Sequence, residues 1–194
     1  MSLILVRHGQ TEMNRGGRFQ GRADSRLTEL GEAQADMVAA TLADSGATAV
    51  VSSPLLRATQ TAERIAAALG VVVQIDERLI EIDYGTWDRE PLSTVSADEW
   101  ARWRADPEFT PPGGESLLTV WDRAVACADD LLVPRRTTVA VSHVSPIKAV
   151  VAWSLGAGLE ATWRMHLDVA AICAVDRRGA DPLLLWFNRK PGAR

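Results

Sequence analysis

Short apolar runs alternate with helix-like segments along most of the chain, and this alternation constrains the fold more than any other feature. Such runs occur at residues 3–6, 49–52, 71–75, 138–141, 172–175 and 183–187. The run at 3–6 holds four apolar residues in succession, which is typical of a strand buried on both faces. Strands that alternate with helices build mostly parallel sheets. The pattern therefore predicts an α/β fold.

Capping residues and glycines place helices between these strands. We expect helices that begin at Thr28, Ser53, Ser116 and Ser145. Pro54 favours the second of them because proline is common in a first helical turn, and Gly70 ends it. In the first helix, the spacing predicts a buried stripe formed by Leu30, Ala33, Met37 and Ala40.

The chain is long enough for one sizeable core. A protein of 194 residues buries roughly 70% of the surface that its unfolded chain exposes. We therefore expect a single domain over residues 1–194. The stretch at 78–115 is longer than an ordinary connection, contains several tryptophans and ends near the breaker PPGG. We predict a lid or small subdomain there.

The net charge and the cysteine content indicate which partners and which cellular compartment to expect. The net charge of −4 disfavours nucleic acid and anionic membranes, although residues 7–26 carry five arginines against two acids and suit a small anionic ligand. Cys127 and Cys173 offer neither a disulfide framework nor a metal-binding spacing. No apolar run approaches the roughly 18 residues of a bilayer span. We expect a cytoplasmic protein, whose oligomeric state the sequence leaves open, a homodimer included.

Polar residues stand where the predicted strands end or where the next helix begins. They are Arg7, His8, Arg57, Glu81 and His143. In open α/β sheets the ligand binds outside the carboxyl ends of the strands. We therefore expect these five side chains to meet at one edge of the sheet.

Familiar cofactor and metal motifs do not occur in the sequence. Neither lysine belongs to a Walker A loop, no GxGxxG is found, and no serine has the glycines of a nucleophile elbow. Neither cysteine is followed six residues later by the arginine of a cysteine phosphatase loop. Three scattered histidines and the lack of a DxD pair disfavour zinc and magnesium. We predict no metal and no cofactor.

A set of short segments follows in order along the chain, within about residues 2–155. They are RHGQTEMN at 7–14, GRFQGRAD at 17–24, SPLLRATQTA at 53–62, LIEIDYGTW at 79–87, PGGES at 112–116 and VSH at 141–143. Together they resemble the histidine phosphatase superfamily, also called the phosphoglycerate mutase-like family. The resemblance implies a three-layer α/β/α sandwich with a mostly parallel central sheet. It also implies a two-step phosphoryl transfer through phosphohistidine.

The resemblance assigns a role to each of the five residues. His8 would be the nucleophile and Glu81 the proton donor, and the phosphoryl group would be held by Arg7, Arg57 and His143. These roles suit the chemistry, because neighbouring cations keep an imidazole unprotonated and guanidinium groups bind phosphate oxygens in pairs. A proton donor must be protonated, and we expect burial beside apolar neighbours to favour that form of Glu81. Asp83 is the alternative donor.

The resemblance also points to residues that contact the substrate. The candidates are Gln10, Thr11, Asn14, Phe19, Gln20, Gly21, Glu115, Val144 and the tryptophans of the lid. Many family members have proline where this chain has Arg26, and glycine where it has Val144. We expect Arg26 to point into solvent, Val144 to narrow the mouth beside His143, and His166 to be structural. Tryptophan clusters more often pack a subdomain than grip a ligand.

The sequence thus predicts a metal-independent phosphomonoesterase that acts on a small phosphorylated metabolite. One alternative is a cofactor-dependent phosphoglycerate mutase, in which phosphohistidine returns its phosphoryl group to a bound product. A second is a phospho-ligand-binding module without turnover, which would have no need of a proton donor.

Overall fold

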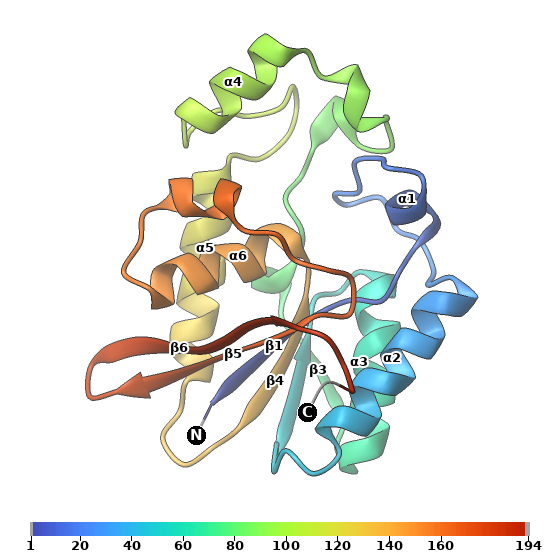
Figure 1. Ribbon diagram of the computed structural model, residues 1–194, viewed down its shortest axis with the longest axis vertical. Coiled ribbons are helices and arrows are strands. Elements are labelled where there is room, and N and C mark those ends of the chain that lie inside the picture. The colour runs from blue at the N-terminus through green and yellow to red at the C-terminus, as the bar shows by residue number, and fades with distance from the viewer. Residues whose placement is uncertain (1, 193–194) are drawn as a thin grey trace.

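A six-stranded sheet with the strand order β3-β2-β4-β1-β5-β6 forms the centre of the computed structural model, which describes residues 2–192 (Figure 1). Its strands are β1 (Leu3–Arg7), β2 (Ala49–Ser52), β3 (Val73–Ile75), β4 (Thr138–Ser142), β5 (Ile172–Arg178) and β6 (Asp181–Arg189). The first four run parallel, whereas β5 pairs antiparallel with β1 and β6 antiparallel with β5. Residues 1, 193 and 194 of the predicted domain lie outside the described residues.

Helices cover both faces of the sheet. The helices are α1 (Glu12–Arg15), α2 (Glu29–Leu42), α3 (Leu56–Leu69), α4 (Ala97–Ala105), α5 (Leu117–Leu131) and α6 (Val144–Ser154). Figure 1 shows α2 and α3 on one side and α5 and α6 on the other. Alternation along β1 explains the layers, because Leu3 and Leu5 pack in the core under α5 and α6 while Ile4 and Val6 pack under α2 and α3. The predicted α/β/α sandwich is confirmed.

The buried face of α2 is not the predicted one. Leu30, Ala33, Met37 and Ala40 are all exposed, and the helix buries Gly31, Ala35, Val38, Ala39 and Leu42 instead. Close approach decides this face, because a Cβ added at Gly31 would lie 2.1 Å from the carbonyl oxygen of Gln10. A glycine and two alanines carry little weight in an apolar pattern, so the larger Leu30 and Met37 gave the wrong stripe.

Two helices begin at other residues than the predicted serines. Thr28 and Ser116 cap α2 and α5 as expected, each accepting a backbone N–H three residues on. In contrast, α3 has Leu55 as its N-cap and α6 has His143. Ser53 is instead engaged through its side chain with His143, and Ser145 lies inside the first turn of α6. Neither serine therefore caps a helix, and both lie near the ends of the parallel strands.

The segment at 78–115 contains more regular structure than the sequence suggested. Three 3-10 turns (Glu77–Leu79, Gly85–Trp87, Leu92–Thr94) precede α4, which begins with a capping box between Ser96 and Glu99. A further 3-10 helix (Leu159–Arg164) contacts α4 and α6. These parts gather around an aromatic core of Phe19, Tyr84, Trp87, Trp100, Trp103, Phe109 and Trp163. The tryptophans therefore do pack a small core, and Figure 1 shows α4 above the sheet.

No helix within residues 2–192 is long and apolar enough to cross a membrane. Cys127 and Cys173 are both buried free thiols, and burial raises their pKa to about 12 and about 11.

Candidate active site

Three neighbouring strands end at the same edge of the sheet, and a polar residue follows each of them. His8 follows β1, Ser53 follows β2 and His143 follows β4, which lies between the other two strands. The sheet continues briefly past the strand ends, since the backbone N–H of His8 donates to Ser142 and that of Ser53 to Val141. This pairing fixes where the side chains emerge from the sheet. Parallel topology alone therefore brings these three groups together.

His8 is held in one tautomer. Its Nδ1 lies 2.7 Å from the carbonyl oxygen of Gly9, which can only accept, so Nδ1 carries the proton. Nε2 is consequently unprotonated, and its lone pair accepts a hydrogen bond from Nε of Arg57 at 3.2 Å. Burial, and after it the charges of Arg57 and Arg7, lowers the pKa of His8 well below the usual histidine value. The ring is neutral at physiological pH.

Arg57 is buried completely, and backbone carbonyls surround its guanidinium. Nη1 donates to Ala23 at 3.0 Å, and Nη2 donates to Gly21 at 2.7 Å and to Gln20 at 3.4 Å. Burial lowers its pKa to about 10, so the side chain remains a cation near neutral pH. Arg57 therefore ties the loop at 20–23 to the side chain of His8.

Arg7 and His143 complete the surroundings of His8. The rings of His8 and His143 lie 5.1 Å apart, and Nε2 of His143 is hydrogen-bonded to Oγ of Ser53 at 2.7 Å. Arg7 donates through Nη1 to the carbonyl of Leu167 at 2.7 Å. Nε of Arg7 and Nδ1 of His143 are buried and have no partner among residues 2–192. Two buried nitrogens beside His8 thus have no hydrogen-bond partner in the described part of the chain.

The carboxylate of Glu81 lies against the first turn of α6. It is buried and accepts three backbone N–H groups, from Ile82 at 2.9 Å, Val144 at 3.1 Å and Ser145 at 3.2 Å. Val144 and Ser145 open α6, so the helix dipole also favours the negative charge. The sequence suggested an apolar environment alone, whereas the backbone provides donors that stabilise the charged form.

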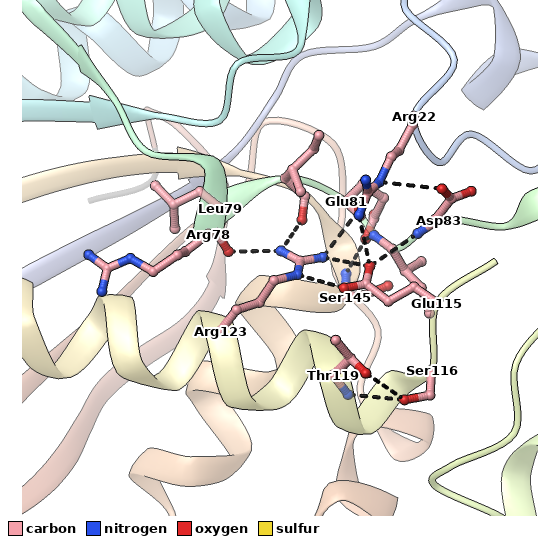
Figure 2. Close-up of polar contacts among 12 residues, drawn as sticks. Arg22, Arg78, Leu79, Glu81, Asp83, Glu115, Ser116, Thr119, Arg123 and Ser145 are labelled. Carbon is pink, nitrogen blue, oxygen red and sulfur yellow. Dashed lines mark hydrogen bonds and ion pairs between the residues drawn. The ribbon is translucent and has the colours of Figure 1, made fainter.

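Arg123 on α5 holds the backbone that carries Glu81. Figure 2 shows its guanidinium between Glu115 and the segment at 78–81. Nε and Nη2 bind the two carboxylate oxygens of Glu115 at 2.9 and 3.0 Å, and the same guanidinium donates to the carbonyls of Arg78 at 2.8 Å and Glu81 at 3.2 Å. Because one partly buried side chain links α5 to this segment, we infer that it fixes the position of Glu81.

A cavity of about 470 Å³ opens beside His8. Arg7, His8 and Glu81 line it, while Arg57 and His143 lie directly behind His8. Of the predicted substrate contacts, the lining includes Gln10, Asn14, Phe19, Gln20 and Val144, together with Trp100 and Trp103.

Three of the predicted contacts lie outside the cavity lining, and their side chains or backbone groups are engaged elsewhere. Thr11 is fully buried and bonds to Gln20 and Asn14. Gly21 faces Arg57 through its carbonyl, and Glu115 binds Arg123. None of the three lines the cavity.

The structure also places three further residues that the sequence analysis discussed. Asp83 is outside the cavity lining and accepts from the backbone of Gly85. His166, expected to be structural, is exposed at the cavity and pairs with Asp168 at 2.9 Å. Arg26 is exposed, as expected.

Several lining residues escaped the sequence analysis. Tyr84 is buried among aromatic rings, and burial raises its pKa. Lys148 lies on α6, and the spacing of four residues from Val144 could have suggested that both share one helical face. Ser53, the partner of His143, was mistaken for a helix cap. Tyr84 and Ser53 contact residues that are distant in the sequence, so no local pattern points to either of them.

The family model of the histidine phosphatase superfamily, branch 1, matches residues 3–190. The chain belongs to this superfamily. The family predicted from the segments between residues 2 and 155 is therefore confirmed, and the match extends through β5 and β6.

Known members of the superfamily resemble this chain closely. Phosphoserine phosphatase 1 of Hydrogenobacter thermophilus is 34% identical over 196 residues, which cover 97% of this chain and 92% of that protein. A probable phosphoglycerate mutase of Cronobacter sakazakii is 38% identical over 184 residues, which cover 91% and 85%. The structure of a mycobacterial glucosyl-3-phosphoglycerate phosphatase with VO3 has a TM-score of 0.88 at 31% identity and covers 97% of this chain and 98% of that one.

Some relatives are longer proteins. A bifunctional protein of Mycobacterium tuberculosis is 42% identical over 178 residues, which cover 88% of this chain but only 48% of that protein. The histidine phosphatase chain thus spans about half the length of this relative.

The two buried histidines make folding sensitive to acid. Burial beside arginines lowers the pKa of His8 and His143 in the folded state, whereas both titrate near 6.5 when unfolded. Below that pH the unfolded chain binds more protons, so stability falls as the pH falls, by at most about 2.7 kcal/mol per pH unit. Urea titrations from pH 7 to pH 5 measure this slope. His8→Gln lowers it and the exposed His166→Gln does not, while a flat profile for the wild type contradicts the analysis.

Replacing Arg123 tests its hold on the segment at 78–81. Arg123→Met leaves three backbone carbonyls without their side-chain donor and removes two of the hydrogen bonds to Glu115, and we expect a loss of about 3 kcal/mol in the free energy of unfolding. The control is Arg15→Met, which breaks only an exposed ion pair with Glu12 and changes stability by about 0.5 kcal/mol or less. Equal losses in both variants contradict the inference.

Proposed function

We propose that the protein is a metal-independent phosphomonoesterase that works through a phosphohistidine on His8. The observation that carries the proposal is the fixed tautomer of His8, whose unprotonated Nε2 lies beside two arginines at a cavity. A neutral imidazole with a free lone pair is a competent nucleophile. The arginines attract the anionic phosphate of an ester to the same place.

In the first step Nε2 of His8 attacks phosphorus, and the bond from phosphorus to the ester oxygen breaks. The Nε–H of Arg57 moves from Nε2 to a phosphoryl oxygen, which frees the lone pair as the substrate arrives. Arg7 supplies its unpartnered Nε–H to another oxygen, and the unpartnered Nδ1 of His143 faces the same group. Guanidinium cations thereby stabilise the charge of the transferring group, a task that a metal ion performs in other phosphatases.

Glu81 supplies the proton for the leaving alkoxide. Three backbone N–H groups hold its carboxyl group in place at the cavity. In the second step the resulting carboxylate takes a proton from water, whose oxygen attacks the phosphohistidine and releases inorganic phosphate and neutral His8.

The cavity suits a small phosphate ester. Gln10, Asn14 and Gln20 offer polar contacts near His8, and Phe19 and Val144 add apolar surface. Phosphoserine phosphatase and glucosyl-3-phosphoglycerate phosphatase among the relatives support a phosphorylated metabolite as the substrate. No nucleic acid or membrane is part of the proposal, and the cytoplasm is its proposed location.

A phosphoglycerate mutase is the second candidate, which the similarity to a probable mutase favours. In that reaction the phosphohistidine gives its phosphoryl group to a bound product instead of water. A binding module without turnover is disfavoured, because the tautomer of His8 and the carboxyl group of Glu81 are features that binding does not need.

Replacing His8 tests the nucleophile. We expect the wild type to hydrolyse p-nitrophenyl phosphate between pH 5 and pH 8 in EDTA, and His8→Ala to lose activity by about 10³-fold or more. Radioactive substrate should leave an acid-labile, alkali-stable label on the wild type and none on the variant. Turnover in His8→Ala or loss of turnover in EDTA contradicts the proposal. If phosphate is released slowly while phosphoglycerates interconvert, the mutase is the better assignment.

Replacing Glu81 tests the proton donor. Glu81→Gln should lower kcat/KM by about 10²-fold or more for an alkyl phosphate, whose alkoxide needs a proton to leave. The loss should be much smaller for p-nitrophenyl phosphate, since nitrophenolate leaves without a proton. Equal losses on the two substrates assign Glu81 to binding or positioning instead.

A further inference from the structure

We infer that Lys148 forms a second anion subsite in the cavity, which binds a carboxylate on the substrate. The inference rests on the proposed function and narrows it to phosphate esters that carry an acid group. Lys148 lies on α6 one turn after Val144, so both residues share a helical face toward the cavity, which they line with Glu81 and Ser145.

The ammonium group of Lys148 has no partner in the part of the chain that the structure describes. Within residues 2–192 it makes no hydrogen bond or ion pair, although the side chain is only partly exposed. Two arginines of the cavity wall each donate at least one hydrogen bond within the protein, Arg7 through Nη1 to the carbonyl of Leu167 and Arg18 to the carbonyl of Arg89. Lys148 is therefore a positive charge that the fold places in the cavity without neutralising it.

The surroundings of Lys148 explain why an external anion fits there. Arg7 repels the ammonium group and Glu81 attracts it, while burial lowers its pKa. Glu81 does not satisfy it, because three backbone N–H groups already occupy that carboxylate. A partly buried charge without a partner is unfavourable, and an anion from the ligand removes that cost.

The rest of the cavity favours a singly charged acid over a second phosphate. Asp168 lies in the lining with His166 and repels a dianion. The buried indole N–H of Trp103, also in the lining, has no acceptor among residues 2–192. Lys148 thus offers a donor to the far end of a ligand, beside a second donor that has no acceptor in the described part of the chain. A carboxylate provides one charge for Lys148 and acceptor oxygens for such donors.

The test compares 3-phosphoglycerate with glycerol 3-phosphate, which has a hydroxymethyl group in place of the carboxylate. We expect the wild type to prefer 3-phosphoglycerate. Lys148→Met should raise its KM roughly tenfold to hundredfold with little change in kcat, and should change neither glycerol 3-phosphate nor p-nitrophenyl phosphate by more than about twofold. Lys148→Arg should keep most of the preference. Lys190, the only other lysine of the chain, is exposed outside the cavity, and Lys190→Met is the matched control.

Each other outcome overturns the inference. Equal losses on all three esters show that Lys148 binds the transferring phosphate, and no preference in the wild type shows that no acid subsite exists. A wild type that hydrolyses p-nitrophenyl phosphate but neither metabolite also contradicts the subsite without touching the proposed function. If no ester is hydrolysed, the proposed function fails. Calorimetric binding of the two metabolites to His8→Ala, with and without Lys148→Met, then decides the subsite without turnover.

Discussion

The burial of one guanidinium, that of Arg57, governs the geometry of the site. A fully buried cation is costly unless its donors are satisfied, and here backbone carbonyls of the loop at 20–23 and the imidazole of His8 satisfy them. The loop must therefore adopt its native path whenever α3 packs on the sheet. In return, the loop and β1 bring Phe19, Gln20 and His8 to the cavity as one unit.

The layers and the family could be predicted because they depend on local patterns. Apolar runs mark the strands of a buried parallel sheet, and Thr28 and Ser116 mark helix starts through a single side-chain contact each. The five residues at the strand ends lie in or directly behind one cavity wall, because topology alone delivers them there. The failure on α2 shows the limit of such patterns. A close approach between Gly31 and Gln10 determines the buried face of α2, and the sizes of the side chains in the sequence do not indicate that approach.

Contacts between distant segments could not be predicted from the sequence. The hydrogen bonds from Arg123 to residues 78–81 link positions more than forty residues apart, and no pattern in either segment indicates this contact. The same holds for Ser53 and His143, where a serine with all the marks of a helix cap binds a histidine instead. Thr11, Gly21 and Glu115 lie outside the cavity lining for a related reason. They adjoin the cavity in sequence, while their polar groups serve the scaffold behind it.

The hold of α6 on Glu81 depends on main-chain atoms alone. Val144 and Ser145 donate through their backbone N–H groups, which every amino acid except proline possesses. The side chains at these two positions are therefore free to vary during evolution without releasing the carboxylate. Because both also line the cavity, substitutions at 144 and 145 can reshape the cavity and leave Glu81 in place. The lining of the cavity can therefore change at these two positions while the backbone keeps Glu81 where it is.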